Sequence, residues 1–254
     1  MSNSNYLFKL LPFLKNILPK KILDSIILSI SKKKMSRLEI TSTIGCAMMC
    51  DYCPQTLIKL ETRKNNLKRK LEMNDFVKFM SKVPIDTQIH WSGYSEPLAH
   101  EDFPKFVKFL KDKNYKQLIS TTMFGRRETE IFMSKFKGFR SVTFHLPDDK
   151  NLMKLKVTDR YMYNLENAIR FQAAQIKDEV YFLVFGKNFH PKIELLLKKL
   201  VNENVINEKS IEVRKHLHSR ASSIDTANLS EKVEEKNNNE PVDFKSKTKK
   251  FYCG

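Results

Sequence analysis

The amino-acid sequence predicts a single α/β domain built around a parallel sheet, and three observations lead to this fold class. The chain has 254 residues, and 41% of them are hydrophobic, so it can bury a sizeable core. After Arg37, apolar β-rich runs alternate with stretches whose apolar residues recur at helical spacing. Strict alternation of strand and helix is typical of right-handed βαβ units, which form parallel sheets that are either open or curled into a barrel.

Six short runs are expected to form strands, because they are apolar and rich in β-branched and aromatic residues. In chain order they are 38–43, 88–91, 117–122, 141–144, 180–185 and 210–213. Between them lie stretches with apolar residues at three and four spacing, which predict helices at 74–82, 103–113, 128–135, 163–175 and 191–202.

The two ends of the chain differ in composition from this core of residues 36–218. Residues 1–35 form a basic amphipathic segment, in which seven lysines face only Asp24 up to position 34. Prolines and lysines interrupt its apolar runs, so it is not expected to span a bilayer. We expect it to pack on the domain, or to make peripheral contact with an anionic membrane through residues 6–34. Residues 219–254 are polar and predict a linker or disordered tail.

Glycines are scarce, and their positions point to a functional edge. The chain has only six, and four of them, Gly45, Gly93, Gly125 and Gly186, fall at or just beyond the end of an expected strand. Glycine lets the backbone turn sharply or approach a ligand closely. In parallel α/β folds, the loops at the carboxyl ends of the strands build the binding site, so we expect the site there.

The cysteines cluster in one place. Cys46, Cys50 and Cys53 fall within eight residues, directly after the first expected strand, and Cys253 lies two hundred positions later. This spacing does not suit a disulfide framework and indicates a reducing compartment, so a cytoplasmic location is expected. Three thiolates on one loop can hold three irons of a [4Fe–4S] cluster and leave the fourth iron open to substrate. Alternatively, His90 or His100 could complete a Cys₃His zinc site.

The C-x₃-C-x₂-C spacing after a first parallel strand resembles the motif of the radical S-adenosylmethionine (SAM) superfamily. The resemblance extends in element order from Ser36 to Arg214 and implies a partial (β/α)₆ TIM-like barrel. It implies that the three clustered cysteines ligate a [4Fe–4S] cluster. It also implies that Tyr52, the aromatic residue before the third cysteine, lies against the adenine of SAM.

Segments at the ends of later strands extend the resemblance. The segment 90–98 is similar to the family's G-G-E-P segment, which grips the methionine amino group of SAM; Glu96 and the following proline match, whereas the two glycines are replaced. The resemblance therefore assigns Gly93, Ser95 and Glu96 to the SAM site. The segment 120–125 looks like the family's T-N-G turn without its asparagine. The segment 142–148 resembles the S-x-D-G stretch, with His145 in the position of the ribose-binding serine.

The implied activity is that of a radical SAM enzyme. One electron from the cluster, supplied by a donor such as flavodoxin or ferredoxin, would cleave SAM to methionine and a 5′-deoxyadenosyl radical. That radical would remove hydrogen from a peptide or small-metabolite substrate. Many peptide-modifying members carry a cysteine-rich carboxyl-terminal extension, called SPASM or twitch. Cys253 resembles the opening of such an extension, otherwise missing or truncated here, or it is a lone thiol.

Other interpretations stay open at this point. The formal net charge is +17, and residues 59–72 hold six basic against two acidic residues, so a phosphorylated sugar, RNA or an acidic peptide could bind. One alternative is a non-catalytic iron–sulfur or zinc protein that binds nucleic acid, although the patch lacks interleaved aromatic residues. Another is a degenerate homologue that keeps the cluster without the chemistry. Five polar residues near strand ends are candidates without an assigned role: Asp148, Asp149, Arg214, His216 and His218.

Overall fold

The computed structural model describes residues 19, 36–214, 216–217 and 234–235. Six parallel strands form one sheet in chain order. They are β1 (Arg37–Ile40), β2 (Gln88–Trp91), β3 (Lys116–Thr121), β4 (Phe139–His145), β5 (Val180–Phe185) and β6 (Ile211–Arg214). A separate parallel pair joins β7 (His216–Leu217) to β8 (Glu234–Glu235). The predicted parallel α/β fold is confirmed, whereas the predicted basic segment and tail lie, except for residues 19 and 234–235, outside the described residues.

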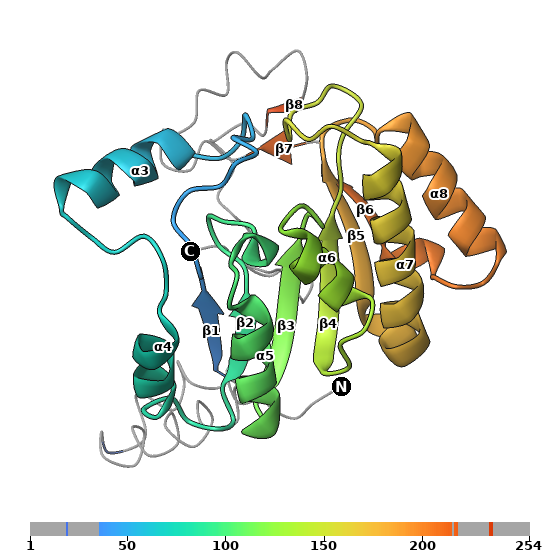
Figure 1. Cartoon of the computed structure of the whole chain (residues 1–254). Coiled ribbons are helices and arrows are strands. Elements are labelled where there is room, and N and C mark those ends of the chain that lie inside the picture. The colour runs from blue at the N-terminus through green and yellow to red at the C-terminus, as the bar shows by residue number, and fades with distance from the viewer. Residues whose placement is uncertain (1–18, 20–35, 215, 218–233, 236–254) are drawn as a thin grey trace.

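The helices lie between the strands. They are α3 (Gln55–Lys64), α4 (Met73–Met80), α5 (Phe103–Asp112), α6 (Arg127–Met133), α7 (Asp159–Ile176) and α8 (Pro191–Asn202). Because the strands follow one another in the sheet, right-handed connections place the crossover helices on one face. Figure 1 shows α5 to α8 along that face and the sheet curving around the opposite one. This is the arrangement of a partial barrel.

The face under the helices forms the apolar core. Along β2, Ile89 and Trp91 are fully buried, and the Trp91 ring stacks on Phe106 of α5 at 5.9 Å between centroids. The indole nitrogen donates to the Gln117 side chain at 3.0 Å, so the polar group of the largest buried ring has a partner. Helix α5 therefore seats on the middle of the sheet through aromatic contacts.

The opposite face of the same strands carries polar side chains. Side chains alternate along a strand, so residues one position away from the core set point into the concave side. The register pairs Glu39 with His90 and Ser120 with Thr143, and His90 Nε2 lies 3.0 Å from the Ser120 hydroxyl. Thr143 and Tyr181 continue this face on β4 and β5. Leu118 and Leu183, the register partners of His90 and His145, lie on the same face, so the interior of the partial barrel combines hydrogen-bonding and apolar groups.

Some expected boundaries were wrong. Strand β1 ends at Ile40, because the chain then leaves the sheet, and Thr43 makes an isolated antiparallel bridge with Lys70. Helix α3 was not predicted, since its charges were read only as a basic patch; its short stretch buries only Gln55 and Thr62 and lacks an apolar face turned to the core. Within the described ranges, no helix is both long and apolar enough to cross a bilayer.

Candidate active site

The loop between β1 and α3 carries the three clustered cysteines at the carboxyl edge of the sheet. It turns at Gly45, whose φ of +102° lies in the region that favours glycine. Cys46 is buried, and Cys50 and Cys53 are half-buried. The Cys53 amide donates to the Cys50 carbonyl at 3.0 Å, which closes a tight turn between the second and third thiols. We call residues 41–54 the cysteine loop.

The thiols of the cysteine loop lie within electrostatic reach of one another. Burial raises the pKa of the Cys46 thiol, the charges of Glu96 and Cys53 raise it further, and backbone hydrogen bonds from Met48 and Glu96 oppose the shift. Burial also raises the pKa of Cys50 to about 12, with added effects from the other two cysteines. At neutral pH these groups are thiols, so a metal that binds them must displace protons.

Gln55 ties the cysteine loop to the loop after β2. Its side chain is buried at the start of α3, and its carbonyl oxygen accepts from the Cys46 amide at 3.1 Å. Its amide nitrogen donates to Cys53 Sγ at 3.4 Å and to the backbone carbonyl of Tyr94. The sequence analysis did not single out Gln55. The only signal was its place two residues after the third cysteine.

The loop after β2 holds the predicted residues Gly93, Ser95 and Glu96. At Gly93, φ is +96° and an added Cβ would lie 1.9 Å from the Thr41 hydroxyl, so only glycine fits against the cysteine loop. The Ser95 hydroxyl oxygen is buried and has no hydrogen-bond partner within the described part of the chain, and the same holds for the hydroxyl of Ser42. Burying a hydroxyl without a hydrogen-bond partner costs free energy, so these two hydroxyls are available to bond a polar ligand at this edge.

Glu96 is fully engaged within the protein. Its side chain is 3% exposed. Oε1 accepts from the Leu98 amide at 3.1 Å and from the Thr121 hydroxyl at 2.6 Å. Oε2 accepts from the amide and the hydroxyl of Thr122, both at 2.6 Å. Burial raises the pKa of Glu96, and these four donors act against the shift. The carboxylate thus joins the loop after β2 to the end of β3.

The loop after β4 supports the cysteine loop from the other side. Asp148 is buried, and its carboxylate accepts from the amides of Lys150, Leu152 and Met153 at 2.8 to 3.2 Å. The loop ordered in this way contacts the cysteine loop directly. The Asp51 amide donates to the Leu152 carbonyl at 2.8 Å, and the Cys50 thiol donates to the Met153 carbonyl at 3.3 Å.

Tyr52 and His145 come together through a residue that the sequence analysis placed only as a strand end. The ring of Phe185, at the end of β5, lies 5.0 Å from the Tyr52 ring and 5.7 Å from the His145 ring. The guanidinium of Arg214 lies over the same ring at 5.7 Å from its centroid. Tyr52 is also packed against Leu152. An aromatic cluster therefore adjoins the cysteine loop and supplies flat faces for a ring-containing ligand.

The two histidines considered for a zinc site lie in different surroundings, and the buried Nε2 of His100 has no hydrogen-bond partner among the described residues. His90 bonds to Ser120 inside the barrel, and the His100 ring packs on Phe106 with its Nδ1 accepting from the Asp102 amide. Among the described residues, no three His, Cys, Asp or Glu side chains converge as ligands of one metal ion. His218 lies outside the described residues, as does Cys253.

Comparisons with known proteins place the fold. No protein-family model matches the sequence, and no curated protein is significantly similar to it. The structure is similar to SuiB of Streptococcus suis bound to the precursor peptide SuiA, with a TM-score of 0.51, 17% identity, and coverage of 84% of this chain and 49% of SuiB. SuiB bound to S-adenosylmethionine gives a TM-score of 0.51 at 16% identity over 91% of this chain and 53% of SuiB.

These similarities establish the fold, and the chain spans about half the length of SuiB. One of these two SuiB structures is bound to the precursor peptide SuiA and the other to S-adenosylmethionine. The predicted partial barrel is confirmed.

Proposed function

We propose that this chain is the core of a radical SAM enzyme that acts on a peptide or a small polar molecule. The observation that carries the proposal is the placement of the cysteine loop. Its three thiols lie at the carboxyl edge of a parallel sheet, between the loop after β2 and the loop after β4. SuiB, with the same fold, has been crystallised with S-adenosylmethionine, which supports the assignment.

The donor set fits a [4Fe–4S] cluster with three protein ligands. Cys46, Cys50 and Cys53 are the residues that would hold it, and the Ser95 hydroxyl on the loop after β2, which has no hydrogen-bond partner in the described part of the chain, offers a bonding group to a polar ligand. A cluster held there would supply the single electron needed for reductive cleavage of SAM, the reaction that initiates hydrogen abstraction from a substrate. The protein holds these partners in place and excludes water.

Different residues around the cysteine loop would bind the two portions of SAM. We assign Tyr52 and His145, together with Phe185, to the adenosine portion, since their three rings adjoin the cysteine loop. Gly93 and Ser95 would lie against the methionine portion. Glu96 has four donors within the protein, so in this proposal it acts by fixing the loop that carries them.

The polar side chains of the interior favour a substrate with hydrogen-bonding groups, because His90, Ser120 and Thr143 line it. SuiB bound to its precursor peptide supports a peptide substrate. The proposal includes a cytoplasmic location and an electron donor such as flavodoxin or ferredoxin. It also keeps peripheral membrane contact through residues 6–34 as an expectation.

Anaerobic reconstitution with iron and sulfide, followed by SAM and a strong reductant, tests this function. We expect 5′-deoxyadenosine and methionine in mass spectrometry, together with the visible absorption of an iron–sulfur cluster. The Cys46→Ala, Cys50→Ala, Cys53→Ala triple variant should lose both signals, and Cys253→Ala should keep them. A cluster that assembles without cleavage of SAM, even with cell extract as a source of substrate, would refute the proposal.

A further inference from the structure

Helix α3 and its flanking residues expose apolar side chains at the edge of the site. Met49 in the cysteine loop, Leu57 and Leu60 on α3, and Leu67 beyond it are 42%, 48%, 53% and 59% exposed. Leu57 and Leu60 are three residues apart and therefore share one side of the helix. We call these four residues together with Lys59, Glu61, Arg63, Lys64 and Arg69 the α3 face, in which Glu61 is the one acidic side chain. Single exposed leucines are ordinary, but a group of apolar side chains at one place marks an interaction surface.

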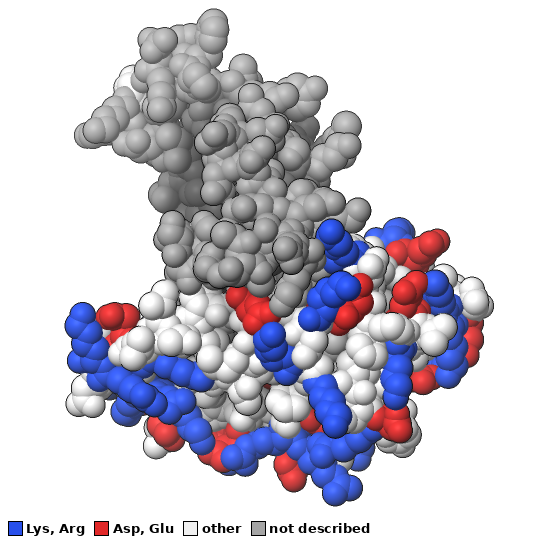
Figure 2. Space-filling model, turned by 90° about the horizontal axis from the view of Figure 1, so that it is seen from above, with Lys and Arg blue, Asp and Glu red and all other residues white. Residues whose placement is uncertain are grey.

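The α3 face is also basic, and several of its charges lack an acidic partner. Among the described residues, no carboxylate lies within ion-pair distance of Lys59, Arg63 or Arg69. Lys59 instead contacts the Met49 sulfur at 3.2 Å, and Lys64 lies 3.8 Å from Glu61, with both side chains largely exposed. Figure 2 shows basic side chains gathered at the left edge of the molecule, the side on which Figure 1 places α3.

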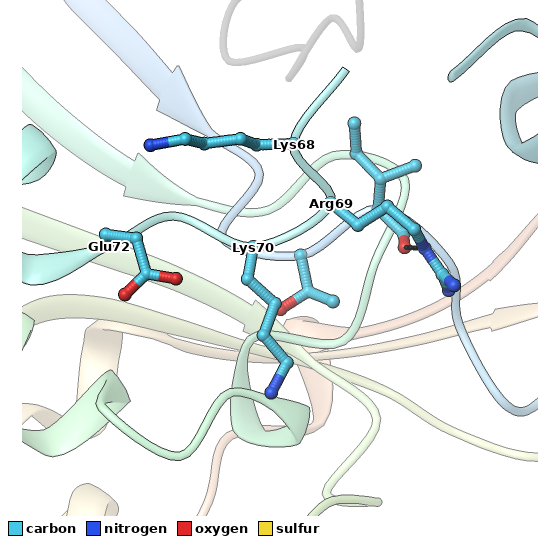
Figure 3. Close-up of a pocket in the computed structure, with 6 residues that line it drawn as sticks. Lys68, Arg69, Lys70 and Glu72 are labelled. Carbon is cyan, nitrogen blue, oxygen red and sulfur yellow. Dashed lines mark hydrogen bonds between the residues drawn. The ribbon is translucent and has the colours of Figure 1, made fainter. Parts of the chain in front are cut away.

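A pocket lies at the base of this face. It is lined by Thr43, Ile44, Lys68, Arg69, Lys70 and Glu72 (Figure 3). Lys68 pairs with Asp75 at 2.9 Å, and Lys70 with Glu101 at 3.1 Å, so acids outside the pocket partly neutralise two of its three bases. The Arg69 Nε donates to the backbone carbonyl of Ile44 at 3.3 Å, which leaves the guanidinium charge without a carboxylate. Arg69, which also belongs to the α3 face, is thus the one pocket base without an ion pair to a described residue.

We propose that the α3 face binds an acidic polypeptide segment that carries apolar side chains. Carboxylates on the segment would pair with Arg63, which lies three residues after Leu60 on the same side of the helix, and with Arg69, and its apolar side chains would cover the leucines. The observations favour a polypeptide over RNA, because the face has exposed leucines and no aromatic side chain on which bases could stack. The binding itself does not depend on the chemistry proposed above, whereas the role given to it below rests on that proposed function.

The position of the face gives the interaction a role. Helix α3 begins two residues after Cys53, and Met49 belongs to the cysteine loop itself. A polypeptide that covers Met49 and Leu57 therefore reaches the rim of the site. Such a contact holds one part of a partner at the edge and raises the effective concentration of a neighbouring part at the site.

Fluorescence anisotropy with the full-length chain tests the proposal. The probe is a fluorescein-labelled amphipathic peptide of Glu and Leu, about four helical turns long. Its matched peptides replace either every Glu with Lys or every Leu with Ser.

The protein variants change the α3 face. One carries Arg63→Glu with Lys64→Glu, and the other carries Leu57→Ser with Leu60→Ser. The controls are Lys108→Glu with Lys113→Glu on and beside α5, which change the net charge equally, and Leu195→Ser, an exposed leucine of α8.

The Glu and Leu peptide should bind, and each pair of changes on the face should weaken it by at least about tenfold, whereas the controls should not. Both matched peptides should bind more weakly. Equal losses in the α5 charge control, equal binding of the peptide without Leu, or no binding at all would overturn the proposal. The same assay is run with single-stranded oligouridine RNA and with vesicles that contain phosphatidylserine. If either binds more tightly than the peptide and loses binding in the face variants, the surface belongs to that ligand and the proposal is overturned.

Discussion

Glu96 illustrates how a single residue changes meaning between sequence and structure. From the sequence it resembles a cofactor-gripping glutamate, and in the structure both of its oxygens are occupied by donors from residues 98, 121 and 122. A buried carboxylate is tolerated only when it is hydrogen-bonded. The first role of Glu96 is therefore structural, because its hydrogen bonds lock the end of β3 to the loop after β2.

Thr121→Val tests this lock. The substitution keeps the shape of a residue that is 1% exposed and removes the hydroxyl that donates to Glu96 at 2.6 Å and accepts from the Met123 amide at 2.9 Å. We expect the free energy of unfolding at pH 7 to fall by about 1–3 kcal/mol, the range for losing a hydrogen bond to a buried charge. Urea denaturation measures it. Thr56→Val on the exposed side of α3 serves as the control and should change stability little; equal effects of the two would contradict the lock.

At the scale of elements, the cysteine loop is held by its neighbours rather than by its own sequence. Gln55 joins it to the loop after β2, and the loop ordered by Asp148 supports it from β4. Lys154 adds an ion pair to Asp51 at 2.9 Å across this contact. Three loops from different strands thus form one unit, which is how parallel folds commonly build sites.

Asp148→Asn should loosen this unit. The side-chain amide of Asn has only one acceptor oxygen, so it cannot accept from all three backbone N–H groups that the carboxylate binds. At least one backbone N–H would then face the side-chain NH₂, which is also a donor. We expect faster hydrogen exchange in residues 148–154 and at the amide of Asp51, with a loss of about 1–3 kcal/mol in stability. Hydrogen–deuterium exchange with mass spectrometry measures the local effect. Asp112→Asn, at the exposed end of α5, should leave these amides unchanged, and unchanged exchange in Asp148→Asn would argue against the support.

At the scale of the whole molecule, stability should depend on pH through His90. Burial, aided by Arg37, lowers the pKa of His90 to about 4 from its ordinary 6.5. Between these values the unfolded chain binds a proton that the folded chain does not, so the free energy of unfolding falls as the pH drops from 6.5 to 4. The total loss from this group is about 3 kcal/mol.

His90→Gln removes the titrating group while leaving an amide in reach of Ser120. Urea denaturation of both proteins at intervals across this pH window isolates the effect, because all other groups are shared. The difference between the two stability curves should change by about 3 kcal/mol from pH 6.5 to pH 4, with the wild type losing more. Parallel curves would show that His90 titrates normally in the folded protein.

The sequence by itself determined the order of strands and helices, the parallel sheet and the position of the cysteine motif. Those features follow from local periodicity and spacing, which are written along the chain. The sequence did not predict α3, because apolar periodicity indicates a helix through the face that the helix buries, and the leucines of α3 face solvent. Only the tertiary structure decided which residues surround the cysteines. Gln55, Asp148 and Phe185 come from separate segments, and their roles arise from contacts between loops that no local pattern encodes.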